Sequence, residues 1–272
     1  MSKNLSKSQQ VLYNLCTQEQ IPLDQALLSI AQDEDPSANE SALHRLDAMA
    51  AQIHIPNPND LLDSISRLNH YFFQEHRFSG DQEDYYNPQN SLIHKVIERK
   101  KGLPILLSIV YMEIARRLGI ELYGIGFPRH FLIQPANSDS GTFYIDTFDN
   151  GNILLKGDLL DWHQQWEIDV PFETCVEPNS NRVIILRVCH NLFYAHNRLQ
   201  NNEGMLRSIE RLMILEPNLT ELHRTRAVIL GRLRRYAESI ESLEHYMLFH
   251  PEANDISDCQ REIEILRQLL KK

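Results

Sequence analysis

Two residues near the middle of the chain, His130 and Asp146, have the types and the spacing of a general base and the carboxylate that orients it. A histidine needs such a partner because a hydrogen bond to one ring nitrogen fixes the tautomer and leaves the other nitrogen for proton transfer. The runs HFLIQ and FYIDTF are rich in β-branched and aromatic residues and enclose a polar loop, which predicts an antiparallel hairpin. If Gln134 pairs near Thr142 or Phe143, His130 faces Asp146 or its immediate neighbour on the same side of the sheet.

The nucleophile that this pair would serve is missing from the place where the order of elements predicts it. The segment GLPILLSIVYMEIARRLGI, 102–120, predicts a buried helix that begins at Pro104 and precedes the strands of His130 and Asp146. This is the order of a papain-like nucleophile, base and orienter, in which the helix start favours an anion. Proline has no reactive group, and its fixed φ and missing N–H suit the first position of a helix.

Two other residues are candidates for a replacement nucleophile. Ser108 lies one turn inside the predicted helix, where hydroxyls commonly bond a backbone carbonyl. Cys175 lies in the loop PFETCVEP and would have to approach His130 from a distant part of the chain. The pair of His130 and Asp146 can also be interpreted as a buried polar contact that fixes strand register. An acyl-transfer or hydrolytic enzyme that uses Cys175 or Ser108 is therefore the alternative to a protein without catalysis.

The elements that position these residues divide the chain into three predicted domains: 1–89, 90–178 and 179–272. The first is a helical N-terminal subdomain, because apolar residues recur at three- and four-residue spacing. Its helices are predicted at 8–15, 23–31, 41–53 and 60–73. The second domain is the core, with a helix near its start, the buried helix from Pro104 and three short strands. The third domain is helical again.

The third domain contains a repeat of tetratricopeptide (TPR) length. Aligning RLQNNEGMLRSIERLMILEP with RLRRYAESIESLEHYMLFHP places Arg198 on Arg232 and Pro217 on Pro251, a shift of 34 residues. The predicted helix pairs are 183–199 with 205–215 and 219–231 with 237–249, and a capping helix follows at 255–270. TPR arrays bind peptides on the surface lined by the first helix of each pair. The polar candidates for this role are Asn191, Tyr194, His196, Arg198, Arg224 and Arg226.

The middle of the chain resembles a known family through NSLIHKVIERKKGLPILLSIVYMEIARRLGIELYGIGFPRHFLI and FYIDTFDNG. With the TPR-like tail, these segments are similar to the SirB-type transglutaminase-like/TPR repeat family proteins of bacteria. The resemblance implies an α+β fold: a helical N-terminal subdomain, a papain/transglutaminase-like core with a small antiparallel sheet, and C-terminal TPR-like helical hairpins. In that core a GxC triplet begins the helix, so the resemblance places Pro104 where the cysteine would stand. The histidine and aspartate carry over to His130 and Asp146, and Arg129 stands where a glycine is usual.

Composition argues against several classes of function. The formal charge of -10, from 37 acidic and 27 basic residues, disfavours non-specific nucleic-acid binding. The longest apolar run, 103–115, is interrupted by Ser108 and Glu113 and is too short to span a membrane. The histidines are dispersed along the sequence, so we expect no metal site. The GxG at 124–126 has no helix after it and no Walker-type loop occurs, so we expect no cofactor.

The cysteines and the lack of an export signal predict a cytoplasmic protein with free thiols. Cys16, Cys175, Cys189 and Cys259 are scattered without CxxC spacing. Trp162 and Trp166, four residues apart, share a face if their segment is helical, which suggests either burial or contact with another copy of the chain. The preferred prediction is a non-catalytic protein-binding or regulatory module with a protein or peptide partner of unknown identity.

Overall fold

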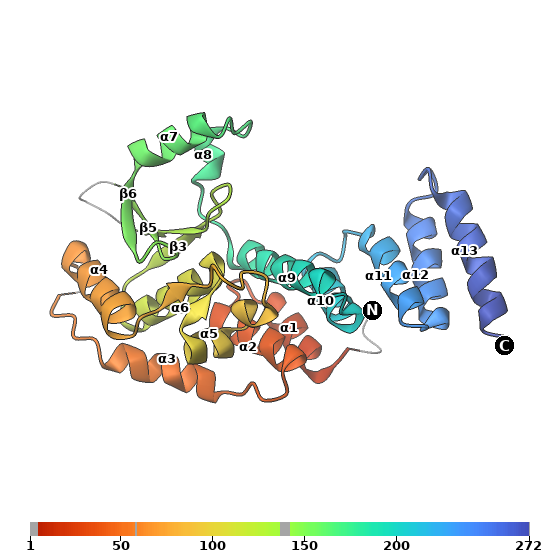
Figure 1. The fold of residues 1–272 in the computed structure, drawn as a ribbon, viewed down its shortest axis with the longest axis horizontal. Helices are drawn as coiled ribbons and strands as arrows, with labels where there is room; N and C mark the ends of the chain where they lie inside the picture. The colour runs from red at the N-terminus through yellow and green to blue at the C-terminus, as the bar shows by residue number, and fades with distance from the viewer. Residues whose placement is uncertain (1–4, 58, 137–141, 272) are drawn as a thin grey trace. The chain divides into compact units, whose positions relative to one another are not determined.

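A buried helix, α6 (Pro104–Arg117), is the central element of the part of the fold that carries His130 and Asp146. The structure, a computed structural model, describes residues 5–57, 59–136 and 142–271. Every α6 residue from Ile105 to Ala115 is buried, because neighbouring elements cover the helix on all sides. Three helices pack against it, α2 (Leu23–Glu34), α3 (Ser41–Ala51) and α5 (Ile93–Arg99), and so do the first strands of the sheet (Figure 1).

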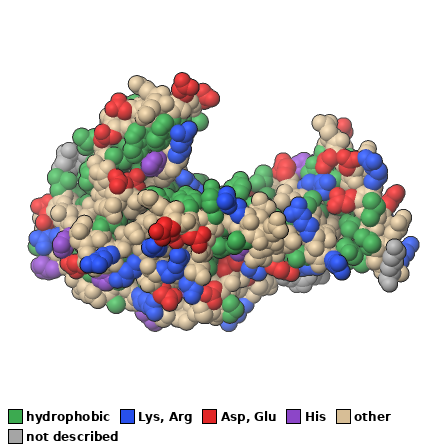
Figure 2. Space-filling view, in the orientation of Figure 1, with side chains coloured by type: hydrophobic (Ala, Val, Ile, Leu, Met, Phe, Trp, Pro, Cys, Tyr) green, Lys and Arg blue, Asp and Glu red, His purple; other side chains and the backbone are tan. Residues whose placement is uncertain are grey.

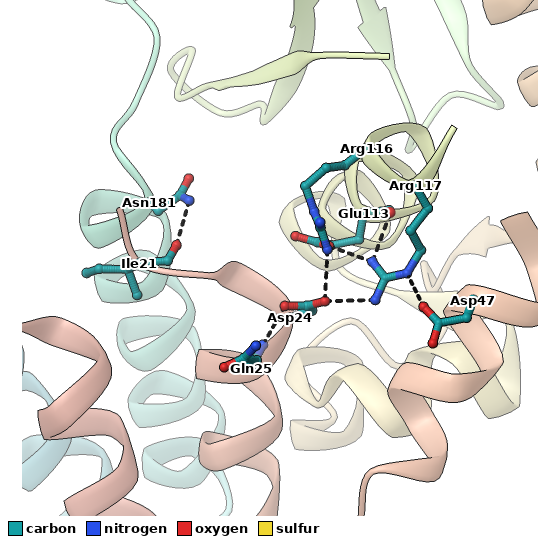
Figure 3. Close-up of polar contacts among 8 residues, drawn as sticks. All are labelled: Ile21, Asp24, Gln25, Asp47, Glu113, Arg116, Arg117 and Asn181. Carbon is teal, nitrogen blue, oxygen red and sulfur yellow. Dashed lines mark hydrogen bonds and ion pairs between the residues drawn. The ribbon is translucent and has the colours of Figure 1, made fainter. Parts of the chain in front are cut away.

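An ion cluster at the C-terminal end of α6 joins that helix to α2 and α3 (Figure 3). The Arg117 guanidinium contacts Asp24 at 2.8 Å, Glu113 at 2.7 Å and Asp47 at 2.6 Å. Arg116 also contacts Glu113 at 2.8 Å and Asp24 at 3.2 Å. Burial and the neighbouring Asp24 raise the pKa of Glu113 above its usual range. The cluster therefore pairs the charges that the folded core would otherwise bury alone.

The remaining helices before the sheet are short. They are α4 (Leu61–Asn69), a π-helical continuation at His70–Glu75, and a 3-10 turn at Pro88–Ser91. The Asp60 side chain caps α4 by accepting a hydrogen bond from the Asp63 N–H at 3.2 Å. Two short parallel strands, β1 (Ser79–Gly80) and β2 (Lys101–Gly102), pair just before α6 begins.

A four-stranded antiparallel sheet follows α6, in the order β3-β4-β5-β6. Its strands are β3 (Leu122–Ile125), β4 (Leu132–Pro135), β5 (Phe143–Asp146) and β6 (Asn152–Leu155). Two helices, α7 (Lys156–Gln165) and α8 (Phe172–Cys175), follow β6. Their apolar side chains join those of the strands in one cluster, for which Phe127, Leu159 and Phe172 are central. Figure 1 shows α7 and α8 lying over the sheet.

The predicted hairpin register, with Gln134 near Thr142 or Phe143, is wrong by one or two residues. Ile133 pairs with Ile145, which brings Leu132 rather than His130 opposite Asp146. His130 precedes β4 and lies in a turn, where its N–H bonds the Phe127 carbonyl at 2.9 Å. Relative to pairing of Gln134 with Thr142 the shift is two residues, and an even shift leaves the alternation of faces unchanged. The part of the connecting loop at 137–141 lies outside the described residues.

The described residues form two compact units. The core unit comprises 14–188, and the tail unit comprises 5–13 with 189–271; α1 (Lys7–Cys16) and α9 (Asn181–Arg198) each cross the boundary as a continuous helix. The N-terminal helices α2 and α3 belong to the core unit, because they pack directly on α6. The three-domain division at 89/90 and 178/179 stays a prediction.

The tail unit consists of consecutive helical hairpins, as the repeat predicted. Its helices after α9 are α10 (Asn202–Leu215), α11 (Leu222–Arg232), α12 (Tyr236–Phe249) and α13 (Ile256–Leu269). Apolar residues of α11, α12 and α13 form a single cluster around Leu243 and Cys259. Helices and a small antiparallel sheet together confirm the predicted α+β class. Among the described residues, no helix combines the length and the apolar character needed to cross a membrane.

Candidate active-site remnant

The first turn of α6 presents no nucleophile. Pro104 is the first residue of the helix, and Leu103 before it is extended, with φ -70° and ψ 158°. Ile105 and Leu106, which complete the turn, are buried. The Thr147 hydroxyl donates to the Pro104 carbonyl at 3.5 Å, and Thr147 directly follows Asp146. This bond links the start of α6 to the residue that follows Asp146.

The imidazole of His130 and the carboxylate of Asp146 form a hydrogen-bonded pair, with 3.1 Å between Nδ1 and Oδ2. Asp146 Oδ1 accepts two further hydrogen bonds, from the backbone N–H groups of Phe148 at 2.9 Å and Asp149 at 3.2 Å. These bonds fix the carboxylate, and a carboxylate acceptor leaves Nδ1 as the donor atom. The side chain of His130 is 30% exposed and that of Asp146 only 5%. The pair therefore directs Nε2 of a partly exposed ring away from the carboxylate.

The backbone around His130 is held in a tight turn. Arg129 has a left-handed φ of 67°, a conformation that a glycine adopts at lower cost. Arg187, on α9, donates to the His130 carbonyl at 2.9 Å, and its guanidinium lies 5.4 Å from the Phe131 ring. Burial lowers the pKa of Arg187. A segment far away in the sequence thus positions the turn that carries the histidine.

Two tryptophans form an aromatic wall beside the His130 ring. Trp162 stacks on the imidazole with 4.6 Å between ring centroids, and Trp166 lies nearly parallel to it at 5.6 Å. The Arg129 guanidinium lies 5.1 Å from the Trp166 ring, within the range of a cation–π contact. Both tryptophans also pack against the apolar cluster of the sheet. The four-residue spacing predicted their common face, but no sequence signal connected that face to His130.

Neither proposed replacement nucleophile is arranged for attack. Ser108 is fully buried, and its hydroxyl shares a hydrogen bond of 2.8 Å with the Thr147 hydroxyl. Cys175 is buried in the cluster that contains Phe127 and Leu159, and its sulfur donates weakly to the Val170 carbonyl at 3.8 Å. Burial raises the pKa of the Cys175 thiol, which disfavours the reactive thiolate.

The predicted partner-binding residues of the tail fall into three groups. Tyr194 and Arg198 are exposed, and Asn191 is half-buried. His196 cannot line a binding surface, because it is only 4% exposed and packs against Gly204 of α10. The remaining two arginines are held in internal ion pairs. Arg224 contacts Asp255 and Glu262, each at 3.0 Å, and Arg226 contacts Glu210 at 3.1 Å.

Comparisons with known proteins identify the family. The family model described as the transglutaminase-like superfamily matches residues 40–190, more than half of the chain. The chain belongs to the transglutaminase-like superfamily. A tetratricopeptide repeat model matches residues 192–270. The resemblance read from 90–133 and 143–151 is therefore confirmed, as is the repeat character of the tail.

Relatives of this transglutaminase-like protein occur in bacteria and animals. A UPF0162 protein of Xylella fastidiosa strain Temecula1 is 30% identical over 257 residues, which cover 89% of this chain and 90% of the relative. A UPF0162 protein of Pseudomonas aeruginosa is 32% identical over 133 residues, or 48% of this chain and 49% of the relative. Mouse F-box only protein 21 is 32% identical over 125 residues, 43% of this chain and 20% of that protein. No solved structure matches the chain.

Proposed function

We propose that this transglutaminase-like protein is a non-catalytic protein-binding or regulatory module. Pro104 carries the proposal: it occupies the first position of α6, and its carbonyl accepts a hydrogen bond from Thr147, the residue after the Asp146 that pairs with His130. The pair has the residue types of the base and orienter of a cysteine-type site, but the start of α6 has no group for them to activate. The buried, bonded hydroxyl of Ser108 and the raised pKa of Cys175 also support the proposal.

Partner binding is proposed for two separate surfaces, one on the TPR tail and one around His130 in the core unit. A transglutaminase-like domain followed by TPR repeats is an architecture that suits protein interaction, since stacked helical hairpins expose an extended surface. Tyr194 is 58% exposed and Leu199 is 62% exposed at the end of α9, and both are within the tail unit. Exposed aromatic and apolar side chains are common anchors of protein interfaces. We also propose a cytoplasmic location, which the four free cysteines support.

Restoring the missing thiol tests whether Pro104 occupies a former nucleophile position. In Pro104→Cys, the helix N-terminus and His130 would lower the pKa of the new thiol, so iodoacetamide should alkylate it at pH 7 faster than any native cysteine. His130→Ala in the same background should slow that alkylation several-fold. An unreactive thiol at position 104, in a variant that unfolds at the wild-type temperature, would contradict the assigned role of this helix start.

Turnover by the wild-type protein decides between a binding module and an enzyme. The module should hydrolyse neither thioester nor amide model substrates and should release no ammonia from glutamine peptides. The alternative enzyme, with Cys175 or Ser108 as nucleophile, predicts turnover that His130→Ala abolishes without loss of folding. Single Cys175→Ala and Ser108→Ala variants would then show which nucleophile acts. Such turnover would refute the non-catalytic assignment.

A further inference from the structure

Arg187 is a half-buried cation without an anionic partner among the residues that the structure describes. Its guanidinium donates to the neutral His130 carbonyl and lies over the Phe131 ring. Two other partly buried arginines of the core unit are paired with acids: Arg117 contacts three carboxylates, and Arg99 contacts Asp81 at 3.0 Å. Burying an unpaired charge is costly, and burial indeed lowers the pKa of Arg187. The contrast with Arg117 and Arg99 therefore indicates that a ligand supplies the anionic partner of Arg187.

The surroundings of Arg187 add positive charge and hydrogen-bond donors. Arg129 is exposed and lies over the Trp166 ring, with no ion pair to any acid in the described part of the chain. Asp146 cannot supply the missing anion, because its oxygens are engaged by His130 and by the N–H groups of the turn that follows. Nε2 of His130 is not used by that pair. A local cationic site thus lies on a chain whose formal charge is -10.

An apolar wall lies beside these donors. The rings of Trp162 and Trp166 stack beside His130 and are half-buried, so part of each indole is open to solvent. Figure 2 shows hydrophobic side chains gathered along the side of α7 and α8 nearest the sheet, with a histidine and basic side chains beside them. Tyr85 is 40% exposed and lies close enough to Arg187 for the cation to act on its pKa, which burial raises overall. Cations beside aromatic rings suit a ligand that has an anionic end and an apolar body.

We propose that the surface formed by Arg129, His130, Trp162, Trp166 and Arg187 binds a carboxylate attached to an apolar group, such as the C-terminal residue of a peptide. The carboxylate pairs with the arginines, whose planar fork matches its two oxygens, and it accepts a hydrogen bond from His130. The apolar group packs on the two indole rings. The inference rests on the proposed function in one respect, since it assigns to the degenerate active site a peptide ligand instead of a substrate.

Binding of a matched pair of small ligands tests this inference. N-acetyl-L-leucine mimics a C-terminal residue, and N-acetyl-L-leucinamide is the same molecule without the charge. Both tryptophans of the chain lie at the site, so intrinsic fluorescence reports occupancy directly. The acid should bind saturably with a Kd on the order of millimolar, as expected for a ligand of this size. The amide should bind at least about tenfold more weakly, which corresponds to the loss of one charge-assisted contact.

Variants identify the groups that hold the carboxylate. Arg187→Gln should weaken binding of the acid about tenfold and leave binding of the amide unchanged, whereas Arg187→Lys should retain part of the affinity. Arg116→Gln, at an exposed arginine of α6, is the matched control and should have no effect. Arg129→Gln tests the same surface if Arg187→Gln does not fold, because Arg129 is exposed.

Four results would overturn the proposal, and three of them come from direct binding. They are equal binding of acid and amide, absence of saturable binding by the acid, and acid binding that neither Arg187→Gln nor Arg129→Gln weakens. Inorganic phosphate that competes more strongly than the acid would show a general anion site and would also refute the carboxylate assignment. None of these readouts depends on turnover. If the protein shows turnover and also binds N-acetyl-L-leucine, only the proposed function is refuted. If it shows no turnover and does not bind N-acetyl-L-leucine, only this inference is refuted.

Discussion

Arg117 and its neighbour Arg116 offer a sharp test of how the core unit is stabilised, because the same two carboxylates bind both. Arg117 contacts Glu113 and Asp24, and its side chain is 13% exposed. Arg116 contacts the same acids, but its side chain is 60% exposed. Replacing each by methionine removes the charge and keeps most of the aliphatic volume. The two variants therefore differ mainly in how deeply the lost cation was buried.

We expect Arg117→Met to cost about 3 kcal/mol of unfolding free energy. Breaking a buried ion pair by removing one partner typically costs about 3 to 5 kcal/mol, since the other charge stays buried and uncompensated. Glu113 and Asp24 are 6% and 7% exposed and keep one cation, Arg116, which favours the lower end of that range. Arg116→Met should cost less than about 1 kcal/mol, as exposed ion pairs do.

The loss in Arg117→Met should also depend on pH. Burial and Asp24 already raise the pKa of Glu113 in the folded state, and removing Arg117 raises it further. A carboxyl group whose pKa is raised by folding stabilises the protein most below its unfolded pKa, and that contribution is lost as the pH rises through the folded value. The deficit of Arg117→Met relative to wild type should therefore be larger at pH 8 than at pH 5.

Urea unfolding followed by tryptophan fluorescence measures these differences in the relevant unit. Both tryptophans, Trp162 and Trp166, lie within the core unit, so the signal reports that unit and not the tail. The two variants and the wild type would be compared at pH 5 and pH 8, with the midpoint and the slope fitted separately. Equal midpoints for Arg117→Met and Arg116→Met at pH 8 would refute the importance of the buried pairing.

Three further predictions concern other parts of the chain. Gly204→Ala should destabilise the tail unit by about 1 to 3 kcal/mol, because an added Cβ would overlap the His196 ring; hydrogen exchange of the tail helices measures this. Gly157→Ala, in α7 of the core unit and with open space around the new Cβ, should not destabilise its unit, as hydrogen exchange of α7 would show. Burial lowers the pKa of His223 to about 4, so the unfolded chain binds a proton more readily than the folded tail unit. The unfolding free energy of the tail should therefore fall by about 1 to 2 kcal/mol between pH 7 and pH 4.5, after allowance for solvent screening. A stability that does not change over this pH range would contradict the prediction. Cys175 should react with a disulfide reagent at pH 7 far more slowly in native than in denatured protein, because burial raises the pKa of its thiol. Fast labelling of Cys175 in the native protein would support the alternative of an enzyme that uses this thiol.

Sequence patterns predicted the elements that carry the candidate site and most of their order. Apolar residues on every face of 103–115 predicted a buried helix, and Pro104 predicted its first residue. The shift of 34 residues between Arg198 and Arg232 predicted the helical hairpins of the tail. These predictions succeed because local spacing and backbone preference act within one element, where neighbours in sequence are neighbours in space.

The hairpin register and the surroundings of His130 needed the tertiary structure. The strand residues predicted pairing, but β4 begins at Leu132, and His130 lies in the turn before it, next to Arg129 in the left-handed region. Periodicity also placed His196 on a potential binding helix, although it packs against Gly204 inside the tail. Register and burial depend on which elements pack together, and this information is not contained in the spacing of one segment.

The sequence by itself determined that the start of α6 carries a proline and that a histidine and an aspartate follow it in the segment that forms a small sheet. It also determined the family, because those motifs are local. Only the tertiary structure decided what surrounds the histidine: the indole rings of Trp162 in α7 and of Trp166 directly after it, and the Arg187 guanidinium of α9, 57 residues along the chain from His130. Contacts between distant segments depend on how the helices pack over the sheet. That arrangement is set by close packing of all the core side chains together, not by the residues of one segment.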